Sequence, residues 1–568
     1  MPLSNEGNFR ELLRYRAESG DSKLKQQLKT SGKNATYIRK TTQNQLIDSC
    51  AKEIIGVILE RVKSARYYSI IFDETTDVSH SSQLSLALCY AFDNHRPKDL
   101  IGFVDVHHAT FEPSTADKEP TVNGKVVGQL VLSLLEEMGL NLLDCVGIGT
   151  DGCAMILSNN CGAVVEIQNK AKNASRCPCF NHALNLSLSR SSAVSSIRNA
   201  IGIIKEVVAF FNASAKRNYV LNKVLKAQLT GIGETRWIER NESLMQFVSE
   251  LPKIIQALEH ISHWSESVTA PKVKTLVTAL HSAEFVVSLQ CLHSICALTL
   301  PLSRLFQKKT LDLGAADGHV FDLLDVLAKR WETCDEEFAL VFEQVKELSD
   351  KIQLAVEVPR ITQRQVYRNN PPHTTPEEYY RRIVFIHMLD SVISDLKSRL
   401  SRDTLNSFRL TVLLLSNIVN CTDDLLQSSV KEISSMYGQL LGLTVPSTRA
   451  TLILAEVHVW RSRWLRVKRE GGIFPSSVEE TAKECDRHLY PYVSSLLDIF
   501  ISLPVSVAAA ERSFSTLRKL KTWLRAQMGQ TRLSGLALLN MHRDIDISID
   551  RVIDRFANSG ARKLEFCL

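Results

Sequence analysis

The segment SIIFDETTDVSHSSQLSLALCYAF, residues 69–92, joins two apolar runs through an acidic turn. Three such runs follow one another along the chain, at 66–73 (RYYSIIFD), 84–92 (LSLALCYAF) and 100–106 (LIGFVDV). Each is short, rich in aromatic or β-branched residues and bounded by polar turns, which is the pattern of a β-strand. The sequence therefore predicts three strands in succession, arranged as an antiparallel meander.

The elements on either side of this meander alternate between helix and strand. Apolar residues recur at helical spacing over 45–62, and the same spacing returns over 124–138 and 161–171, with a fourth strand at 143–149. Three meandering strands followed by alternating helix and strand is the order of an RNase H-like domain. The expected fold class is α/β RNase H-like, with a mixed five-stranded sheet, flanking helices and a large all-α insertion.

Beyond residue 183 the pattern is helical almost to residue 500, and Pro- or Gly-rich breaks at 369–376, 443–447 and 471–475 divide it. A chain of 568 residues exceeds what one hydrophobic core usually organises. We expect these parts: a basic N-terminal arm (1–44), the first part of the RNase H-like domain (45–239), an all-α insertion (240–445), a linker with a helix (446–484), a C-terminal region that completes the RNase H-like domain (485–550) and a tail (551–568).

The composition argues against a membrane protein or a secreted protein. Hydrophobic residues make up 44% of the chain, and no window approaches the roughly eighteen uninterrupted apolar residues that a membrane span needs. The N-terminus lacks the apolar stretch of a signal peptide, so we expect no membrane partner and a cytosolic or nuclear location. The 13 cysteines are mostly scattered, as in reduced intracellular proteins, and none has zinc-finger spacing. A net charge of +6 permits nucleic-acid binding without establishing it.

Acidic residues follow two of the predicted strands. Asp73 comes directly after 69–72, with Asp77 four residues later, and Asp151 follows the strand at 143–149. A carboxylate just past the end of a buried strand is rigidly held and faces solvent, as a metal ligand must be. The alternative is that DETTD and TDG are ordinary turns capped by their own side chains. These two segments alone do not decide between a metal site and turns.

A third acid lies in LPVSVAAAERSFSTLRKLKTWLR, residues 503–525. Pro504 and Ser506 precede a strong helix, and Glu511 falls in its first turns. The three alanines at 508–510 would let this helix approach a sheet closely enough for Glu511 to reach the other acids. The alternative is an ordinary glutamate near a helix N-terminus, where the helix dipole favours it.

The particular residues of five segments resemble the hAT family of DNA transposases. Residues 489–545 resemble its C-terminal dimerisation region, above all in ERSFS (511–515) and in Arg532-Leu533, and residues 69–92 resemble its first strands. Between them GTDGCAM, CPCFNHALNLSLS and ETRW stand in the family's order. The resemblance covers about residues 20–550. It looks closest to the branch with the zinc finger MYM-type and THAP-domain hAT-derived proteins.

The resemblance implies that Asp73, Asp151 and Glu511 form the family's acidic triad. In such enzymes two divalent metal ions, usually Mg²⁺, activate water or a 3′-hydroxyl and stabilise the leaving oxygen of a phosphodiester. Mg²⁺ suits carboxylates combined with phosphate oxygens. Glu74 and Asp77 are candidates for supporting these ligands.

Two further motifs carry roles in the family. Cys179 and His182 match its C-x-x-H element, which the resemblance places beside the active site; a zinc site with Cys177 is the alternative, although structural zinc normally has four ligands. Trp237 matches an aromatic residue that stacks on an extruded base, and Arg236 would contact phosphate. The alternative for Trp237 is burial at a domain junction.

The C-terminal helix also offers a candidate dimerisation surface. Phe514, Leu517, Leu520 and Leu524 recur at three- and four-residue spacing, a stripe that must be covered. The resemblance implies pairing with a second copy, whereas the commoner fate of such a stripe is burial within its own chain.

Two functions from different classes follow from the resemblance. The chain would be either a Mg²⁺-dependent transposase that cuts and joins DNA, or a domesticated, catalytically inactive protein that uses the same fold to dimerise and to regulate DNA or chromatin. Either protein would be nuclear. The sequence contains no N-terminal zinc-finger module of the BED or THAP type, so recognition of DNA would require another part, a partner or the basic arm.

Overall fold

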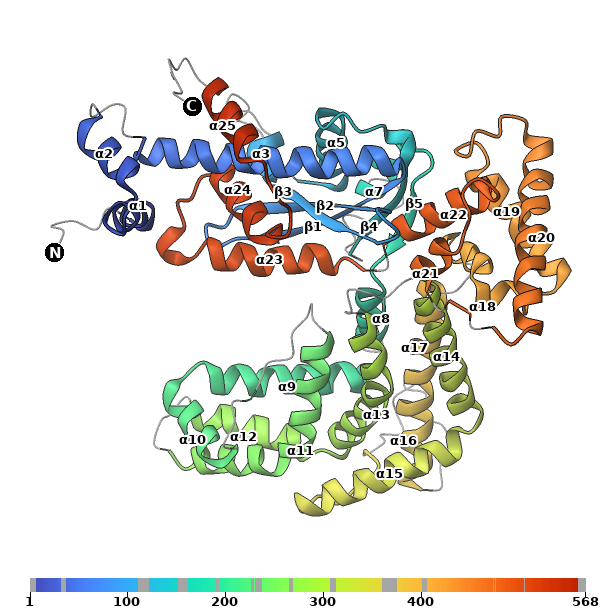
Figure 1. Ribbon diagram of the computed structural model, residues 1–568. Helices are drawn as coiled ribbons and strands as arrows, with labels where there is room; N and C mark the ends of the chain where they lie inside the picture. Colours follow the sequence, from blue (N-terminus) through green and yellow to red (C-terminus); the bar gives the residue numbers. More distant parts are fainter. Residues whose placement is uncertain are drawn as a thin grey trace. The chain divides into compact units, whose positions relative to one another are not determined.

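The computed structural model describes residues 7–31, 37–110, 122–151, 162–190, 194–225, 229, 237–264, 269–306, 313–359, 375–400, 406–472, 474–475, 477–504 and 506–559. Figure 1 follows the chain through them. Five strands form one sheet, in the order β3-β2-β1-β4-β5. They are β1 (Tyr68–Thr76), β2 (Ser82–Tyr90), β3 (Lys98–Asp105), β4 (Cys145–Thr150) and β5 (Ser175–Pro178).

The meander is confirmed. β1 pairs antiparallel with β2, and β2 pairs antiparallel with β3, with an irregularity between Leu86 and Ala87. The four strands expected from the sequence begin and end within three residues of β1 to β4. The five-stranded sheet confirms the predicted α/β fold class. β5 has four residues and contains Pro178, so it offered too short a run to be recognised by periodicity.

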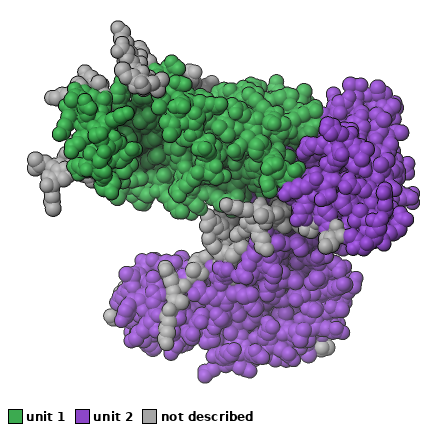
Figure 2. Space-filling view, viewed as in Figure 1, with its two compact units in different colours: residues 1–148, 154–174, 507–568 green, residues 149–153, 175–506 purple. Residues whose placement is uncertain are grey.

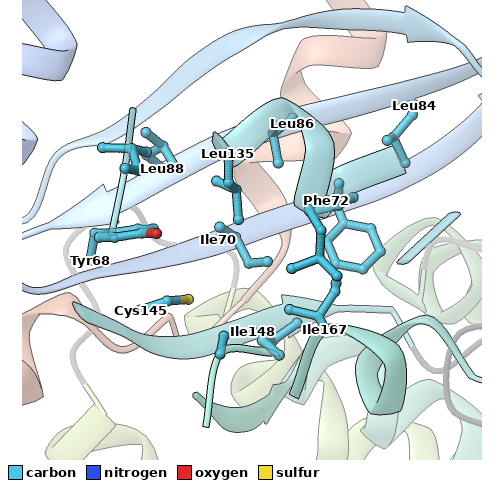
Figure 3. Packing of buried hydrophobic residues seen from close by; sticks show 14 of the residues in the cluster. Tyr68, Ile70, Phe72, Leu84, Leu86, Leu88, Leu135, Cys145, Ile148 and Ile167 are labelled. Carbon is cyan, nitrogen blue, oxygen red and sulfur yellow. The ribbon is translucent and has the colours of Figure 1, made fainter. Parts of the chain in front are cut away.

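The two faces of the sheet bury different side chains, because successive residues of a strand point to opposite faces. On one face the apolar side chains of β1 and β2 pack against α3 (Lys40–Ala65), α5 (Gly124–Glu137) and α7 (Ala163–Lys170). Figure 3 shows Ile70 and Phe72 of β1 directed toward this layer. Both are fully buried, so this is the main core of the RNase H-like domain.

The opposite face is covered by the end of the chain. α23 (Ala508–Leu520) packs against β1, β2 and β3, and α24 (Gln530–Met541) packs against β3 and α3. α25 (Ile549–Asn558) follows and packs on α3, where buried Glu53 pairs with Arg551 and Arg555 at 3.3 and 3.0 Å. The predicted return of the chain to the early strands is therefore observed.

The chain divides into two compact units, coloured in Figure 2. One comprises residues 1–148, 154–174 and 507–568, and the other comprises 149–153 and 175–506. The helical body is thus longer than the expected 240–445. Residues 491–502 also belong to it, because they form a helix that packs on neighbouring helices of that body.

The expected basic arm contains two helices, α1 (Asn8–Glu18) and α2 (Ser22–Thr30). The other elements of the first unit are α4 (Val106–Thr110), η2 (Leu142–Asp144) and η6 (Trp523–Arg525). Helices of the second unit are α8 (Phe180–Arg190), α9 (Ser195–Asn212), α10 (Ala215–Leu225), α11 (Trp237–Ser262), α12 (Thr269–Leu280), α13 (Ala283–Phe306), α14 (Leu313–Glu332), α15 (Cys334–Lys351), α16 (Pro376–Tyr380), η4 (Arg381–Ile386), α17 (His387–Leu400), η5 (Asn406–Leu413), α18 (Leu415–Ile418), α19 (Asp423–Tyr437), α20 (Pro446–Arg469), α21 (Val478–Lys483) and α22 (Pro491–Ser502).

Within the described part of the chain, α13 alone is long and apolar enough to cross a membrane by length and composition. This helix departs from the expectation that no window approaches the composition of a membrane span. Of its most apolar 18 residues, 67% are buried inside the protein. Burial of this kind is also what the central helix of a helical unit requires.

Candidate functional site

Asp73 lies within β1, because the strand continues to Thr76. The expectation that Asp73 follows the end of the strand is therefore wrong, because the strand ends three residues later, at Thr76. Ser85 of β2 stands directly opposite Asp73, so the two side chains project from the same face of the sheet. The backbone N–H of Glu74 donates to Asp73 Oδ1 at 2.8 Å. Asp73 is therefore a half-buried carboxylate on a central, rigid strand.

Glu511 lies in the first turn of α23, as the sequence predicts. Ala509 and Ala510 are buried beside it, and the Oγ atoms of Ser513 and Ser85 are 2.7 Å apart. Small residues thus bring this helix into direct contact with β2. Glu511 itself is half-buried on the flank of the helix.

Asp73 and Glu511 consequently share one face of the sheet. Asp73 projects on the same face as Ser85, and Ser85 contacts the helix that carries Glu511. Both acids belong to the same compact unit. An alanine in place of Ser513 would remove this contact, whereas a large residue there would push the helix away from the strand.

Asp151 follows β4 immediately and is half-buried. The backbone N–H of Cys179 donates to the carbonyl of Thr150 at 3.2 Å, so the C-x-x-H element lies beside this acid. Burial lowers the pKa of His182, the negative charge of Asp151 opposes that shift, and the positive charge of Arg399 adds to it. The structure therefore brings Asp151, Cys179 and His182 together within one unit.

Arg399 was not identified from the sequence. It pairs with Asp395 at 2.6 Å, with both side chains largely buried, and Ser187 Oγ donates to the same carboxylate at 2.8 Å. This network joins α17 to α8, the helix that carries His182. Arg399 is more than 200 positions from the C-x-x-H element, and no local spacing connects the two.

No group of three or more acidic, histidine or cysteine side chains lies close enough to hold a metal ion among the residues that the structure describes. Cys177, Cys179 and His182 are therefore no such group. Asp73 and Glu511 belong to one compact unit and Asp151 to the other, so the triad and its binding of Mg²⁺ stay predictions.

The two acids expected to support the triad have other partners. Asp77 pairs with Lys521 at 2.5 Å, and both side chains are buried. Glu74 accepts a hydrogen bond from Ser82 Oγ. Asp77 therefore holds the end of α23 to the turn after β1, which is a structural role.

The expected DNA contacts are only partly within the described structure. Arg236 lies outside the described residues. Trp237 is the first residue of α11, and its side chain is also outside the description. Their proposed roles therefore stay predictions.

The predicted dimerisation stripe divides into two parts. Phe514 and Leu517 are 7% and 2% exposed and pack with Phe103, whose ring is stacked on that of Phe514 at 6.5 Å between centroids. Leu520 packs against the same cluster. Phe514 and Leu517 therefore cover β3 in their own chain and are not free for a surface between copies, whereas Leu520 is only half-buried. Leu524 is 98% exposed and is still available to a partner.

Comparison with known proteins agrees with this architecture. The model of the ZMYM1/FAM200 RNase-like domain matches residues 2–115, and that of the hAT family C-terminal dimerisation region matches 475–545. The human "52 kDa repressor of the inhibitor of the protein kinase" is 25% identical over 99% of this chain and 73% of its own length. The mouse protein of the same name is 24% identical over 98% and 73%. These matches support the resemblance of this chain to the hAT superfamily.

Proposed function

We propose that this chain is a transposase-derived nuclear protein that dimerises through its C-terminal region and binds DNA as a regulator. The observation that carries the proposal is the packing of the hAT C-terminal region on the sheet. α23 and α24 bury Phe514, Leu517 and Leu533 against β3. Residues 507–545 of this region are thus an integral part of the RNase H-like domain, and a dimer formed through them would hold two such domains together.

Regulation is favoured over strand transfer by the comparison with known proteins. The two relatives that match nearly the whole chain are named as repressors. A fold retained for binding and pairing accounts for this likeness.

DNA is the proposed partner because the protein is basic and the hAT transposases that it resembles act on DNA. A net charge of +6 gives a favourable but modest electrostatic attraction to phosphates. Binding by this mechanism weakens steeply with salt, because counterions are released from the DNA. A nuclear location follows from the proposed partner.

Metal-dependent DNA cleavage is the second candidate, favoured by the acids at all three family positions. Carboxylates at these positions would hold Mg²⁺ and supply metal-assisted phosphodiester chemistry if the site formed on DNA. Asp73 would then hold a metal ion from its rigid place on β1.

Fluorescence anisotropy and a nicking assay test both candidates on the full-length chain. We expect salt-dependent binding to a labelled duplex of mixed sequence and no Mg²⁺-dependent nicking. An absence of binding at low salt would overturn the proposal. Nicking that requires Mg²⁺ and disappears in Asp73→Asn and Glu511→Gln, with DNA binding intact, would establish the enzyme instead.

A further inference from the structure

A large hollow lies where the N-terminal helix α1 meets the C-terminal region in the RNase H-like unit. α1, the start of α3 and the segment between α23 and α24 border it, with a cavity volume of about 1270 Å³. Figure 1 shows α1 near the beginning of α3 and the turn after α23. This volume exceeds the roughly 300–1,000 Å³ that is usual for a small-molecule pocket. An extended ligand fits such a space better than a compact one.

The lining of this hollow carries charge of one sign. It includes five basic residues and no Asp or Glu: Arg10, Arg39, Lys40, Arg525 and Arg532. Two acids of the same segment pair with cations outside the lining: Glu11 pairs with Arg14 at 2.9 Å and Asp21 with Arg16 at 3.2 Å. Cations that surround a concave site with little countercharge focus a positive potential in it.

Contacts within the fold hold two of these cations in place, one from each end of the sequence. Arg10 Nε donates to the carbonyl of Ile38 at 3.0 Å, which ties α1 to the entrance of α3. Arg532 of α24 donates to Asn44 Oδ1 of α3. The N-terminal basic segment and the C-terminal region therefore form one surface, although more than 480 residues separate their contributions.

An exposed aromatic ring stands at the same site. Trp523 lines the hollow and is 79% exposed, although tryptophan is ordinarily well buried. It begins the short 3₁₀ turn η6 (Trp523–Arg525), so it is directly followed in the chain by exposed Leu524 and then by Arg525. A positively charged groove with an exposed aromatic ring is the arrangement that binds single-stranded nucleic acid, with phosphates on the cations and a base on the ring.

We propose that this hollow binds the backbone of single-stranded or locally unpaired DNA, with Lys40 and Arg525 on phosphates and Trp523 stacked on a base. The inference rests on the proposed DNA-binding function and assigns a place to it. A nucleic acid suits the site better than an acidic peptide does, because a base can stack on the exposed ring of Trp523 beside the cations. Because any base can stack on an aromatic ring, the site would bind DNA of different sequences.

The test uses the full-length chain and a fluorescent single-stranded oligonucleotide of mixed sequence. Lys40→Ala with Arg525→Ala removes two exposed cations of the hollow. Lys125→Ala with Lys172→Ala is the matched control, because it removes two exposed cations from the same unit outside the hollow. We expect the first pair to weaken binding by about tenfold and to reduce the salt slope by about 1.4, and the control to change neither.

Trp523 provides an independent readout of stacking. Trp523→Leu keeps an apolar side chain but no ring, and we expect binding to weaken by about fivefold to a hundredfold. Trp523→Phe retains a ring and should restore most of the affinity. Circular dichroism and thermal melting of each variant check the fold, which exposed substitutions should leave unchanged.

The outcomes separate this inference from the function on which it rests. If the wild-type chain binds no DNA, the proposed function fails. If it binds DNA and the hollow variants match the control, only the assigned site is wrong. If the hollow variants instead reduce the mass measured by light scattering and leave DNA affinity unchanged, the hollow is an interface with a second copy, which also overturns the inference.

Discussion

Lys521 Nζ donates to Asp77 Oδ2 at 2.5 Å, and the two side chains are 6% and 1% exposed. The pair joins the residue after α23 to the turn between β1 and β2. Gln83 Nε2 donates to the same carboxylate oxygen at 3.2 Å, and the backbone N–H of Ser79 donates to Oδ1 at 2.7 Å. This buried ion pair has the additional hydrogen bonds that it needs to offset the cost of desolvation.

Breaking this pair should loosen α23 from the sheet. Lys521→Met leaves the Asp77 carboxylate buried without its cation, and we expect a cost of about 3–5 kcal/mol. Hydrogen exchange followed by mass spectrometry would show faster opening of β1 and α23. Lys519→Met is the control, since Lys519 is exposed on the same helix. Equal exchange in the two variants would contradict the structural role of the pair.

The same carboxylate predicts a pH dependence of stability. Burial by itself would raise the pKa of Asp77, but the hydrogen bonds from Lys521, Ser79 and Ser81 outweigh it and lower that pKa below its ordinary value. The stabilisation is therefore present above the unfolded pKa of about 3.9 and is lost as the pH falls through the lower folded value. Thermal melting from neutral to acidic pH should reveal this loss. In Asp77→Asn the dependence below about pH 4 should be shallower, and an unchanged profile would refute the assignment.

Leu517 and Leu524 should respond differently to substitution. Leu517 is 2% exposed in the cluster against β3, so Leu517→Ala should cost about 2–5 kcal/mol through the lost burial and the cavity left behind. Leu524→Asp changes a 98% exposed residue and should leave monomer stability almost unchanged while weakening self-association. Denaturation midpoints and light scattering measure the two effects. If Leu517→Ala weakened self-association and left the denaturation midpoint unchanged, Leu517 would instead lie at a surface between copies.

Gly535 should tolerate no larger residue. An added Cβ would lie 2.6 Å from Cγ2 of Ile47, because α24 approaches α3 closely at this point. We expect Gly535→Ala to cost about 1–3 kcal/mol by forcing the helices apart. Gly202→Ala offers a matched control, since nothing lies within 4 Å of its added Cβ. A neutral effect of Gly535→Ala would show that α24 can shift without loss.

The sequence predicts the sheet well because each of its first four strands is a continuous apolar run bounded by polar turns. β5 was missed because four residues containing Pro178 give no period. The predicted start of the helical insertion was also too late. Helical periodicity beyond residue 183 is the same on both sides of residue 240, so the pattern contains no signal of where one unit ends.

The candidate site was predictable only where chemistry is local. Glu511 and its alanines identify a helix that packs closely on a sheet, and the structure bears out that packing at Ser513. Partners brought in by tertiary structure were not accessible to such reasoning. Lys521 could not be assigned to Asp77, nor Arg399 to the surroundings of His182, because the fold alone creates these proximities.

Light scattering on the full-length chain, alone and with duplex DNA at low salt, tests the central claim most directly. We predict twice the mass of a single chain without DNA, and a larger complex in which two chains and the DNA elute together. Leu524→Asp should move the protein toward the mass of one chain. A chain that stays monomeric at micromolar concentration and elutes apart from the DNA would contradict a dimerising, DNA-binding function.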